Sequence, residues 1–253
     1  MPAPAVILGR PGGVKERGDM EKLKQIYEGK AKKLYETEDA DLLIQEFKDD
    51  ATAFDATKRG TILNKGVINN KLSEKIFVIL SRKGIPTHFV KRLNDRDMLV
   101  KRVQIVPIEV TMRNIVAGGM AKLLGLDEGI ILKEPVLEWH YKEDALHDPL
   151  INDDHVRALG IATGKELELI KKYSYKINEV MKKFFDSKNL ILVDFKLEFG
   201  RYKGKVILAD EISPDTCRLW DKTTKEKLDK DRFRRDLGNV EGAYQEVLRR
   251  VME

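Results

Sequence analysis

Apolar residues recur at helical spacing in three long segments of the chain. Between Lys65 and Arg82 they fall every three or four positions, the spacing of one buried helix face, and we expect this helix to pack on a sheet. A second such pattern starts at Thr163, which can form a capping box with Glu166, and continues to about Asn189. The third covers Val240 to Met252 and predicts a closing amphipathic helix.

Shorter apolar runs, bounded by glycine, proline and polar residues, predict β-strands. They come in groups and not as repeating strand–helix–strand units, which indicates an α+β fold with antiparallel pairing. The last two form the strongest hairpin of the chain. The predicted strands are residues 23–28, 32–37, 42–48, 87–93, 98–103, 105–112, 190–199 and 205–212.

The first 19 residues lack this periodicity. They are rich in proline and glycine, and no charged segment precedes an apolar core of signal-peptide length. We therefore expect residues 1–19 to form a flexible N-terminal extension, and Met20 could serve as the functional start.

Composition narrows the class of protein. The chain has 253 residues, of which 42% are apolar and 35% charged, as in ordinary soluble globular proteins. The net charge of +5 is small for so charged a chain, which argues against nucleic acid as a partner. No apolar run approaches the roughly 20 residues that cross a bilayer, so we expect no membrane association. One cysteine, Cys217, excludes an intrachain disulfide and favours the cytoplasm.

The predicted hairpin carries a charged face. Residues two apart in a strand share a face, so Asp194, Lys196 and Glu198 project together. A turn centred on Tyr202 would set Asp194 opposite Asp210 and add a third carboxylate, although a one-residue change of register would reverse this. Such a patch suits Mg²⁺, which accepts a few carboxylates together with water and phosphate oxygens. The alternative is an exposed strand face whose charges only keep it soluble.

A second group of basic residues lies near the start of the chain. Gly29, Lys30, Lys32 and Lys33 occupy a turn between two predicted strands. The segment lacks the second glycine and the Lys-Ser or Lys-Thr pair of a Walker loop. A β-turn with lysines can still lie across a triphosphate, as the glycine-rich hairpin of protein kinases does. Alternatively, it is a solvated hairpin tip.

Two further segments have the residues of an anion site. In the first, Arg113 follows a predicted strand, and Gly118 and Gly119 precede a predicted short helix, so a guanidinium and backbone N–H groups could converge. In the second, the segment from Ser213 to Asp221 reads as a loop, and its Arg218 could hold a phosphate or carboxylate through its planar fork. Each arginine could instead form an ordinary salt bridge, and Cys217 is expected to be a buried thiol and not a nucleophile.

The order of these segments closely resembles the SAICAR synthetase family, the phosphoribosylaminoimidazole-succinocarboxamide synthases of de novo purine synthesis. The likeness runs from about Gln25 to Val251. The motifs that carry it are YEGKAKKLYET from Tyr27, PIEVTMRNIVAGG from Pro107, KEDALHDPLIN from Lys142, LILVDFKLEFG from Leu190, ADEISPDTCRLWD from Ala209 and LDKDRFRRDLG from Leu228.

The resemblance implies a ligase that joins L-aspartate to the carboxylate of the carboxyaminoimidazole ribonucleotide (CAIR), with ATP giving ADP and phosphate. It also implies two lobes with ATP between them, loosely similar to kinases and ATP-grasp enzymes. On this basis residues 20–103 would form a smaller β-rich lobe, and residues 104–253 a larger α+β lobe ending in the C-terminal helix. The small-molecule partners would be CAIR, L-aspartate and ATP, and we expect a homo-oligomer, with a dimer favoured.

The resemblance further implies roles for individual residues. Many family members have a serine at the position of Gly119, so a hydroxyl contact to the 5′-phosphate of CAIR is lost here. Lys196 and Asp194 would be catalytic. The implied nucleotide-binding residues are Lys30, Ala31, Lys32, Lys142, Glu198 and Asp210; the implied substrate-binding residues are Arg113, Gly119, Asp148, Lys196 and Arg218; and Glu198 and Asp210 would hold Mg²⁺.

Amide formation explains this crowding of cations. A carboxylate is a poor electrophile, so it needs activation, most simply as an acyl phosphate made from ATP, and the protein must neutralise and position anions.

The rival hypotheses are a kinase-like phosphotransferase and an RNA-binding module. Against the first, the sequence lacks the kinase catalytic-loop and Asp-Phe-Gly motifs. The residues that bind L-aspartate stay open, with Asp55, Lys58 and Arg59 as candidates.

Overall fold

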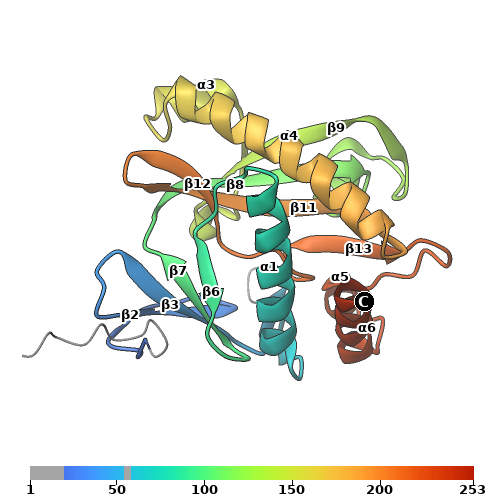
Figure 1. The fold of residues 1–253 in the computed structure, drawn as a ribbon. Helices are drawn as coiled ribbons and strands as arrows, with labels where there is room; N and C mark the ends of the chain where they lie inside the picture. Colours follow the sequence, from blue (N-terminus) through green and yellow to red (C-terminus); the bar gives the residue numbers. More distant parts are fainter. Residues whose placement is uncertain (1–19, 54–57) are drawn as a thin grey trace, which may run out of the picture.

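The computed structural model describes residues 20–53 and 58–253. The predicted extension at residues 1–19, and Asp55 with its neighbours, lie outside this part of the chain. The described residues form an α+β fold built on two antiparallel sheets, as the strand pattern predicts (Figure 1). The chain passes from one sheet to the other at residues 102–103, close to the predicted lobe boundary. The division into lobes stays a prediction.

The first sheet has five strands and comes from the N-terminal part. Its spatial order is β1 (Gln25–Glu28), β2 (Lys32–Glu36), β3 (Leu42–Phe47), β7 (Asp97–Lys101) and β6 (Phe89–Arg92). A separate hairpin of β4 (Asp50–Ala53) and β5 (Lys58–Thr61) follows β3 in sequence.

The second sheet has six strands and centres on the longest one. Its order is β10 (Leu150–Ile151), β9 (Ile131–Tyr141), β8 (Gln104–Ile115), β11 (Leu190–Tyr202) and β12 (Lys205–Ala209), and β13 (Cys217–Asp221) also pairs with β11. The strand β9 is missing from the sequence prediction, because Pro135 interrupts its alternation.

Helices cover the sheets and join them. The long helix α4 (Gly164–Asp186) packs on the second sheet, and α1 (Lys65–Arg82) packs on the first sheet and on α6 (Val240–Met252) (Figure 1). The bounds of α1 and α6 confirm the prediction, and so does the Thr163–Glu166 capping box of α4. Short helices are α2 (Gly118–Leu124), α3 (Asp153–Ala158), the 3₁₀ turn Asp144–Leu146 and α5 (Asp231–Arg234).

Two predictions about the hairpin region are wrong. The β11–β12 ladder pairs Glu198 with Ala209 and Tyr202 with Lys205, so its turn lies at residues 203–204 and not at Tyr202. The segment after it is also not a loop throughout, because Cys217–Asp221 forms β13 and Arg218 lies opposite Asp194 in the ladder. Pairing with a strand distant in sequence decided this, which local turn residues do not reveal.

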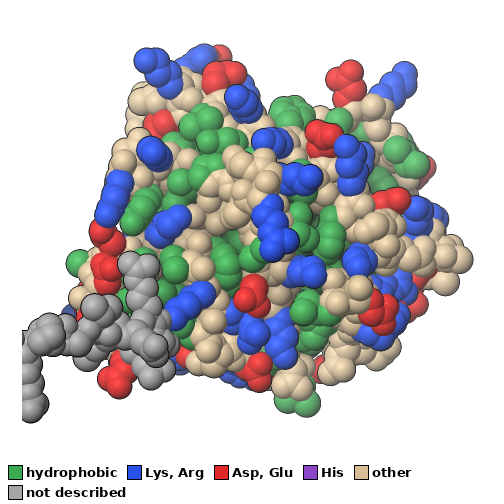
Figure 2. Space-filling view, in the orientation of Figure 1, with side chains coloured by type: hydrophobic (Ala, Val, Ile, Leu, Met, Phe, Trp, Pro, Cys, Tyr) green, Lys and Arg blue, Asp and Glu red, His purple; other side chains and the backbone are tan. Residues whose placement is uncertain are grey.

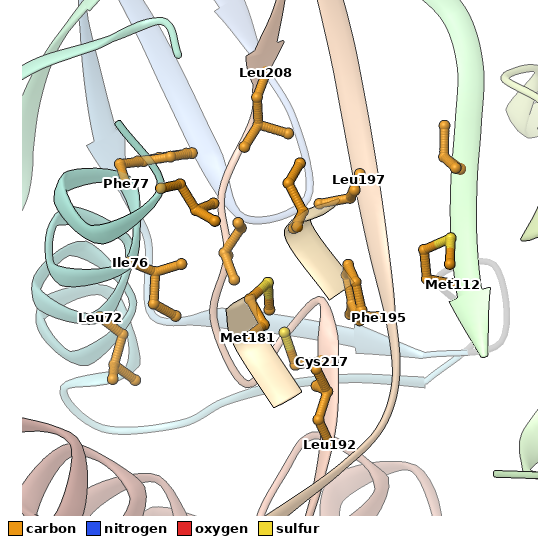
Figure 3. Close-up of a cluster of buried hydrophobic side chains, with 14 of the residues drawn as sticks. Leu72, Ile76, Phe77, Met112, Met181, Leu192, Phe195, Leu197, Leu208 and Cys217 are labelled. Carbon is orange, nitrogen blue, oxygen red and sulfur yellow. The ribbon is translucent and has the colours of Figure 1, made fainter. Parts of the chain in front are cut away.

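The larger of two apolar clusters among the described residues connects both sheets. It includes Leu43 and Phe47 from the first sheet and Phe195 and Leu197 from the second. Figure 3 shows how Leu72, Ile76 and Phe77 of α1 face Met181 of α4 and the strands that carry Met112, Leu192, Phe195, Leu197, Leu208 and Cys217. The thiol of Cys217 is free and buried in this core, as expected.

No helix among residues 20–53 and 58–253 is long and apolar enough to cross a membrane. On the face in Figure 2, lysine and arginine side chains are spread among acidic and apolar ones and do not gather in one patch.

Candidate active site

A cavity of about 1570 Å³ opens between the two sheets. Its walls come from β2, β3 and β7 of the first sheet, β8 and β11 of the second, the β4–β5 hairpin and the segments around residues 210–218 and 230–234. Every residue to which the resemblance assigns a role lines it: Lys30, Ala31, Lys32, Arg113, Gly119, Lys142, Asp148, Asp194, Lys196, Glu198, Asp210 and Arg218. Of the two described candidates for L-aspartate, Arg59 lines it as well, whereas Lys58 pairs with Asp236 outside the lining.

Lysines and carboxylates interleave on the floor of the cavity. The buried carboxylate of Glu198 accepts hydrogen bonds from Lys142 at 2.8 Å and Lys196 at 2.9 Å. Lys196 also donates to Glu109 at 2.7 Å, and Glu109 lies directly opposite Glu198 in the β8–β11 ladder. Burial and the charge of Asp210 raise the pKa of Glu198, but Lys196 and Lys142 outweigh them, so its net shift is downward and the carboxylate stays ionised.

Asp210 belongs to the same cluster, although strand alternation does not predict this. The observed register would set residue 210 opposite Leu197, on the core face, but Asp210 follows the last residue of β12 and has a left-handed backbone with φ 63°. Its carboxylate pairs with Lys32, which also lies 3.0 Å from Glu211. Burial raises the pKa of Asp210, yet Lys32 and Lys196 lower it to about 2. The carboxylate of Asp210 is therefore available to a cation.

The number and kind of oxygen donors in this cluster decide which divalent cation it can bind. Among the described residues no group of three or more His, Cys, Asp and Glu side chains forms a closed metal cage. Two ionised carboxylates, Glu198 and Asp210, face one cavity, and three ammonium groups already balance them. Such a site suits Mg²⁺ bound jointly with phosphate oxygens and water, and not a zinc-type cage.

A pair of arginines forms a second cationic centre. Arg113 donates to Glu138 at 2.7 Å and to Asp194 at 2.9 Å, and Arg218 donates to Asp194 at 2.8 Å and to Asp231 at 2.9 Å. These carboxylates fix both guanidinium planes while other N–H donors remain to bind an anion. Gly119, in the first turn of α2, lies beside Arg113.

Asp194 therefore lies with the arginines and not with the lysines. Its carboxylate is buried and bridges the two guanidinium groups, so its contacts indicate that it orients them. Burial raises its pKa, and Arg218 and Arg113 oppose that effect without reversing it. A catalytic role for Asp194 stays a prediction.

Asp148 lies at a sharp turn on the rim. His147 and Asp148 both have left-handed backbones, and the Asp148 carboxylate accepts the backbone N–H of Glu143 at 2.9 Å. The Asp148 carbonyl contacts the ring of His140 at 3.1 Å, and His140 lies 3.3 Å from Glu138, the partner of Arg113. The turn is thus tied to the arginine centre.

Sequence reasoning missed several acidic residues of the site, among them Glu109, Glu138 and Glu211. Glu109 could have been found, because it alternates with Val110 and shares a strand face with Thr111 and Arg113. Glu211 and Glu138 carry no such signal, because a non-β segment and an unrecognised strand bring them to the site.

A group of apolar side chains from the first sheet also lines the cavity, beside Lys32 and Lys101. Leu34, Leu43 and Val100 line it, together with His88 and Gln45, which are 3% and 4% exposed. Within the described residues, both ring nitrogens of His88 and the amide nitrogen of Gln45 have no hydrogen-bond partner. Burial, with help from Lys32 and Lys101, lowers the pKa of His88 to about 3, so its ring is neutral near pH 7. Unpartnered buried polar atoms facing a cavity indicate a polar ligand.

Comparison with known proteins bears on this geometry. Residues 25–251 match the model of the family described as SAICAR synthetase. The chain is 60% identical over 234 residues to a phosphoribosylaminoimidazole-succinocarboxamide synthase of Caldanaerobacter subterraneus subsp. tengcongensis, which covers 92% of this chain and 100% of the relative.

Solved structures give the same likeness in three dimensions. The enzyme of that name from Ehrlichia chaffeensis superposes with a TM-score of 0.89 at 45% identity, covering 90% of this chain and 98% of that one. A SAICAR synthetase solved in complex with ADP has a TM-score of 0.87 at 49% identity, with 90% and 97% covered.

Proposed function

The chain belongs to the SAICAR synthetase family, and we propose that the cavity between its two sheets is the active site in which ATP, CAIR and L-aspartate meet. The activity is that of the family, an ATP-using ligase of de novo purine biosynthesis. The single observation that carries the location is that all twelve residues with a role implied by the resemblance line one cavity. The oligomeric state and the cytoplasmic location stay predictions.

The phosphates of the nucleotide lie along the lysines, and its base packs against the apolar side chains of the first sheet. Leu34 and Leu43 offer apolar surfaces on which a flat ring can pack. The polar edge of the purine would then be the hydrogen-bond partner that His88 and Gln45 lack. The phosphates then extend toward the turn at Lys30 and the ammonium of Lys32. A relative at 49% identity was solved in complex with ADP, which supports a nucleotide site in this fold.

Glu198 and Asp210 would hold Mg²⁺ with the nucleotide's phosphates. Bound there, the ion would draw electron density from the phosphoryl oxygens and neutralise their charge. Lys196 and Lys142 already contact Glu198 and so stand where negative charge grows during transfer. Because Glu198 is buried, water screens its carboxylate less than a surface carboxylate, and the ammonium groups that contact it interact with it more strongly.

The chemistry proceeds in two displacements. A carboxylate oxygen of CAIR attacks the γ-phosphorus of ATP, the bond to the β–γ bridging oxygen breaks, and ADP leaves. The amine of L-aspartate then attacks the acyl carbon, phosphate departs, and the nitrogen loses a proton. An acyl phosphate is a far better electrophile than a carboxylate, so the residues act by positioning and neutralising anions.

The arginine centre holds the 5′-phosphate of CAIR. Arg113 and Arg218 are oriented by Asp194, Glu138 and Asp231, and Gly119 can offer its backbone N–H from the first turn of α2. We assign Asp194 to positioning these guanidinium groups. Asp148 approaches the imidazole part from the rim turn.

Replacing Glu198 or Asp210 by alanine tests the proposal. Each change should lower kcat by at least about 10³-fold, because the metal loses a ligand and the lysines that contact that carboxylate lose their partner. The fold should persist, as judged by circular dichroism, and the apparent Mg²⁺ requirement should rise. Glu179→Ala, which removes a surface partner of Lys183, is the matched control with unchanged turnover. Wild-type turnover by Glu198→Ala or Asp210→Ala would refute the assignment.

A further inference from the structure

Lys230 is a buried cation in the cavity that neither the nucleotide site nor the arginine centre uses. It precedes α5, its side chain is 13% exposed, and it lines the cavity. Among the described residues, the carboxylate oxygen nearest to its ammonium group belongs to Asp215, at 3.9 Å, which is longer than a hydrogen bond.

The carboxylate of Asp215 is already committed to other groups. Lys65, at the first turn of α1, donates to one oxygen at 2.7 Å, and Tyr244 of α6 donates to the other at 2.6 Å. Asp215 and Lys65 are both buried, so they form a closed ion pair. Lys230 is therefore a second cation beside a carboxylate that is already neutralised, and burial lowers its pKa more than Asp215 raises it.

Arg234 lies one helical turn further along the same segment. One of its terminal nitrogens donates to Asp231 at 2.6 Å, and the other oxygen of Asp231 accepts from Arg218. Arg234 lines the cavity and still has further N–H donors for a ligand. It thus stands next to the arginine centre, on the side toward Lys230.

The segment with Lys230 and Arg234 lies between the lysine cluster around Glu198 and Asp210 and the arginine centre. Glu211 is within electrostatic reach of Lys230 and also pairs with Lys32, which belongs to the nucleotide side. The backbone carbonyl of Thr216, the residue after Asp215, accepts the N–H of Lys196 at 2.8 Å. A ligand held by Lys230 and Arg234 would therefore lie close to both Lys196 and Arg218.

We propose that Lys230 and Arg234 bind the carboxylates of L-aspartate. This inference rests on the proposed function and deepens it, because it names the site of the third reactant. The reaction brings together three anions, and two sets of cations are assigned to ATP and to the CAIR phosphate. A dicarboxylate needs two cations, and an under-paired ammonium beside a guanidinium fork meets that need.

Steady-state kinetics of Lys230→Met tests this inference. The variant keeps the length of the side chain and removes the charge. The KM for L-aspartate should rise at least about tenfold, since a charge-assisted hydrogen bond is lost, while the KM values for ATP and CAIR change less than about threefold. Lys227→Met is the matched control, because Lys227 lies on the same segment but pairs with Glu128, and its KM values should equal those of the wild type.

Two outcomes would overturn the inference. One is an unchanged KM for L-aspartate. The other is an equal or larger rise in the KM for CAIR, which would assign the two cations to the ribonucleotide. Should Lys230→Met fail to fold, Arg234→Gln at the more exposed position must show the same selective rise.

An isotope experiment separates this inference from the proposed mechanism. With ATP and CAIR but without aspartate, reversible phosphoryl transfer moves ¹⁸O from the β–γ bridge of ATP to the other β-phosphoryl positions. Lys230→Met should scramble the label at the wild-type rate, because aspartate is not needed; a loss of scrambling would contradict the inference. If the wild type itself does not scramble, the acyl phosphate is refuted, while the selective KM effect still decides the role of Lys230.

Discussion

Gly118 and Gly119 adjoin each other but meet different constraints. Gly118 has a left-handed backbone with φ 54°, and a Cβ atom there would lie 2.3 Å from the guanidinium of Arg218. A Cβ atom on Gly119 would meet only Arg113, at an ordinary contact distance of 3.7 Å. The first glycine is therefore required by close approach, whereas the second leaves room for a side chain.

Gly119→Ser should strengthen substrate binding. The added hydroxyl would start beside Arg113 and can donate to the phosphate, so the KM for CAIR should fall about threefold to tenfold. Steady-state kinetics at saturating ATP and aspartate measures it. Gly118→Ser is the contrasting variant and should lose most activity, because its side chain collides with Arg218. Equal effects of the two substitutions would contradict this account of the turn.

At the scale of elements, the central strands each serve both core and site. Phe195 and Leu197 of β11 enter the core, while Lys196 and Glu198 between and beyond them enter the cavity. The neighbouring β8 does the same and adds Glu109. A rigid, double-sided strand pair thus holds the charged side chains at fixed spacing, which loops cannot do as well.

Helices α1 and α6 are joined through one buried carboxylate. Asp215 accepts Lys65 from α1 and Tyr244 from α6, and α1 packs directly on α6. Asp215→Asn should lower the free energy of unfolding by about 3–5 kcal/mol, because the buried charge of Lys65 loses its counterion.

Urea denaturation followed by circular dichroism measures the effect of Asp215→Asn. The comparison variant is Tyr244→Phe, which removes one hydrogen bond to the carboxylate and should cost only about 1–3 kcal/mol. If Asp215→Asn were as stable as the wild type, the buried ion pair would not hold the two helices together.

At the scale of the whole molecule, the two sheets share one core and meet at residues 87–88. Thr87 forms a parallel bridge with Leu208, and the N–H of His88 donates to the carbonyl of Leu208 at 2.8 Å. The cavity therefore lies between parts that stabilise each other, and a charge at this junction affects the entire fold. His88 packs edge-on against Phe77 of α1 and is 3% exposed.

The buried ring of His88 should make stability fall in acid. Its pKa is about 3 in the folded protein and about 6.5 when unfolded, so the unfolded state binds the extra proton between these values. The stabilisation is complete above pH 6.5 and is lost as the pH falls toward 3, by about 2 kcal/mol at pH 5.

His88→Gln, which stays neutral, tests this contribution. The difference in free energy of unfolding between variant and wild type should shift by about 2 kcal/mol in favour of the variant between pH 7 and pH 5. Taking the difference removes the contributions of other groups, among them Asp229, whose pKa of about 7 acts in the opposite direction. Parallel pH profiles of the two proteins would contradict this interpretation of His88.

Local patterns in the sequence determined much of the protein. Helices α1 and α6, the capping box at Thr163 and the alternation of Lys196 and Glu198 with core residues follow from spacing within one element. Such patterns are set by the geometry of a single helix or strand, so they can be read without knowing its neighbours. The motifs also sufficed to name the family, which the comparisons confirm.

Tertiary structure decided what depends on distant segments. The register of β11 against β12, the conversion of Cys217–Asp221 into a strand and the left-handed turn at Asp210 follow from pairing and packing across the fold. Only the assembled structure shows that Asp194 bridges two arginines, and that Lys230 lies buried beside a carboxylate already bound by α1 and α6. The physical reason is that the burial and the charge interactions of a side chain depend on all its neighbours in space. Those neighbours cannot be read from the order of residues along the chain.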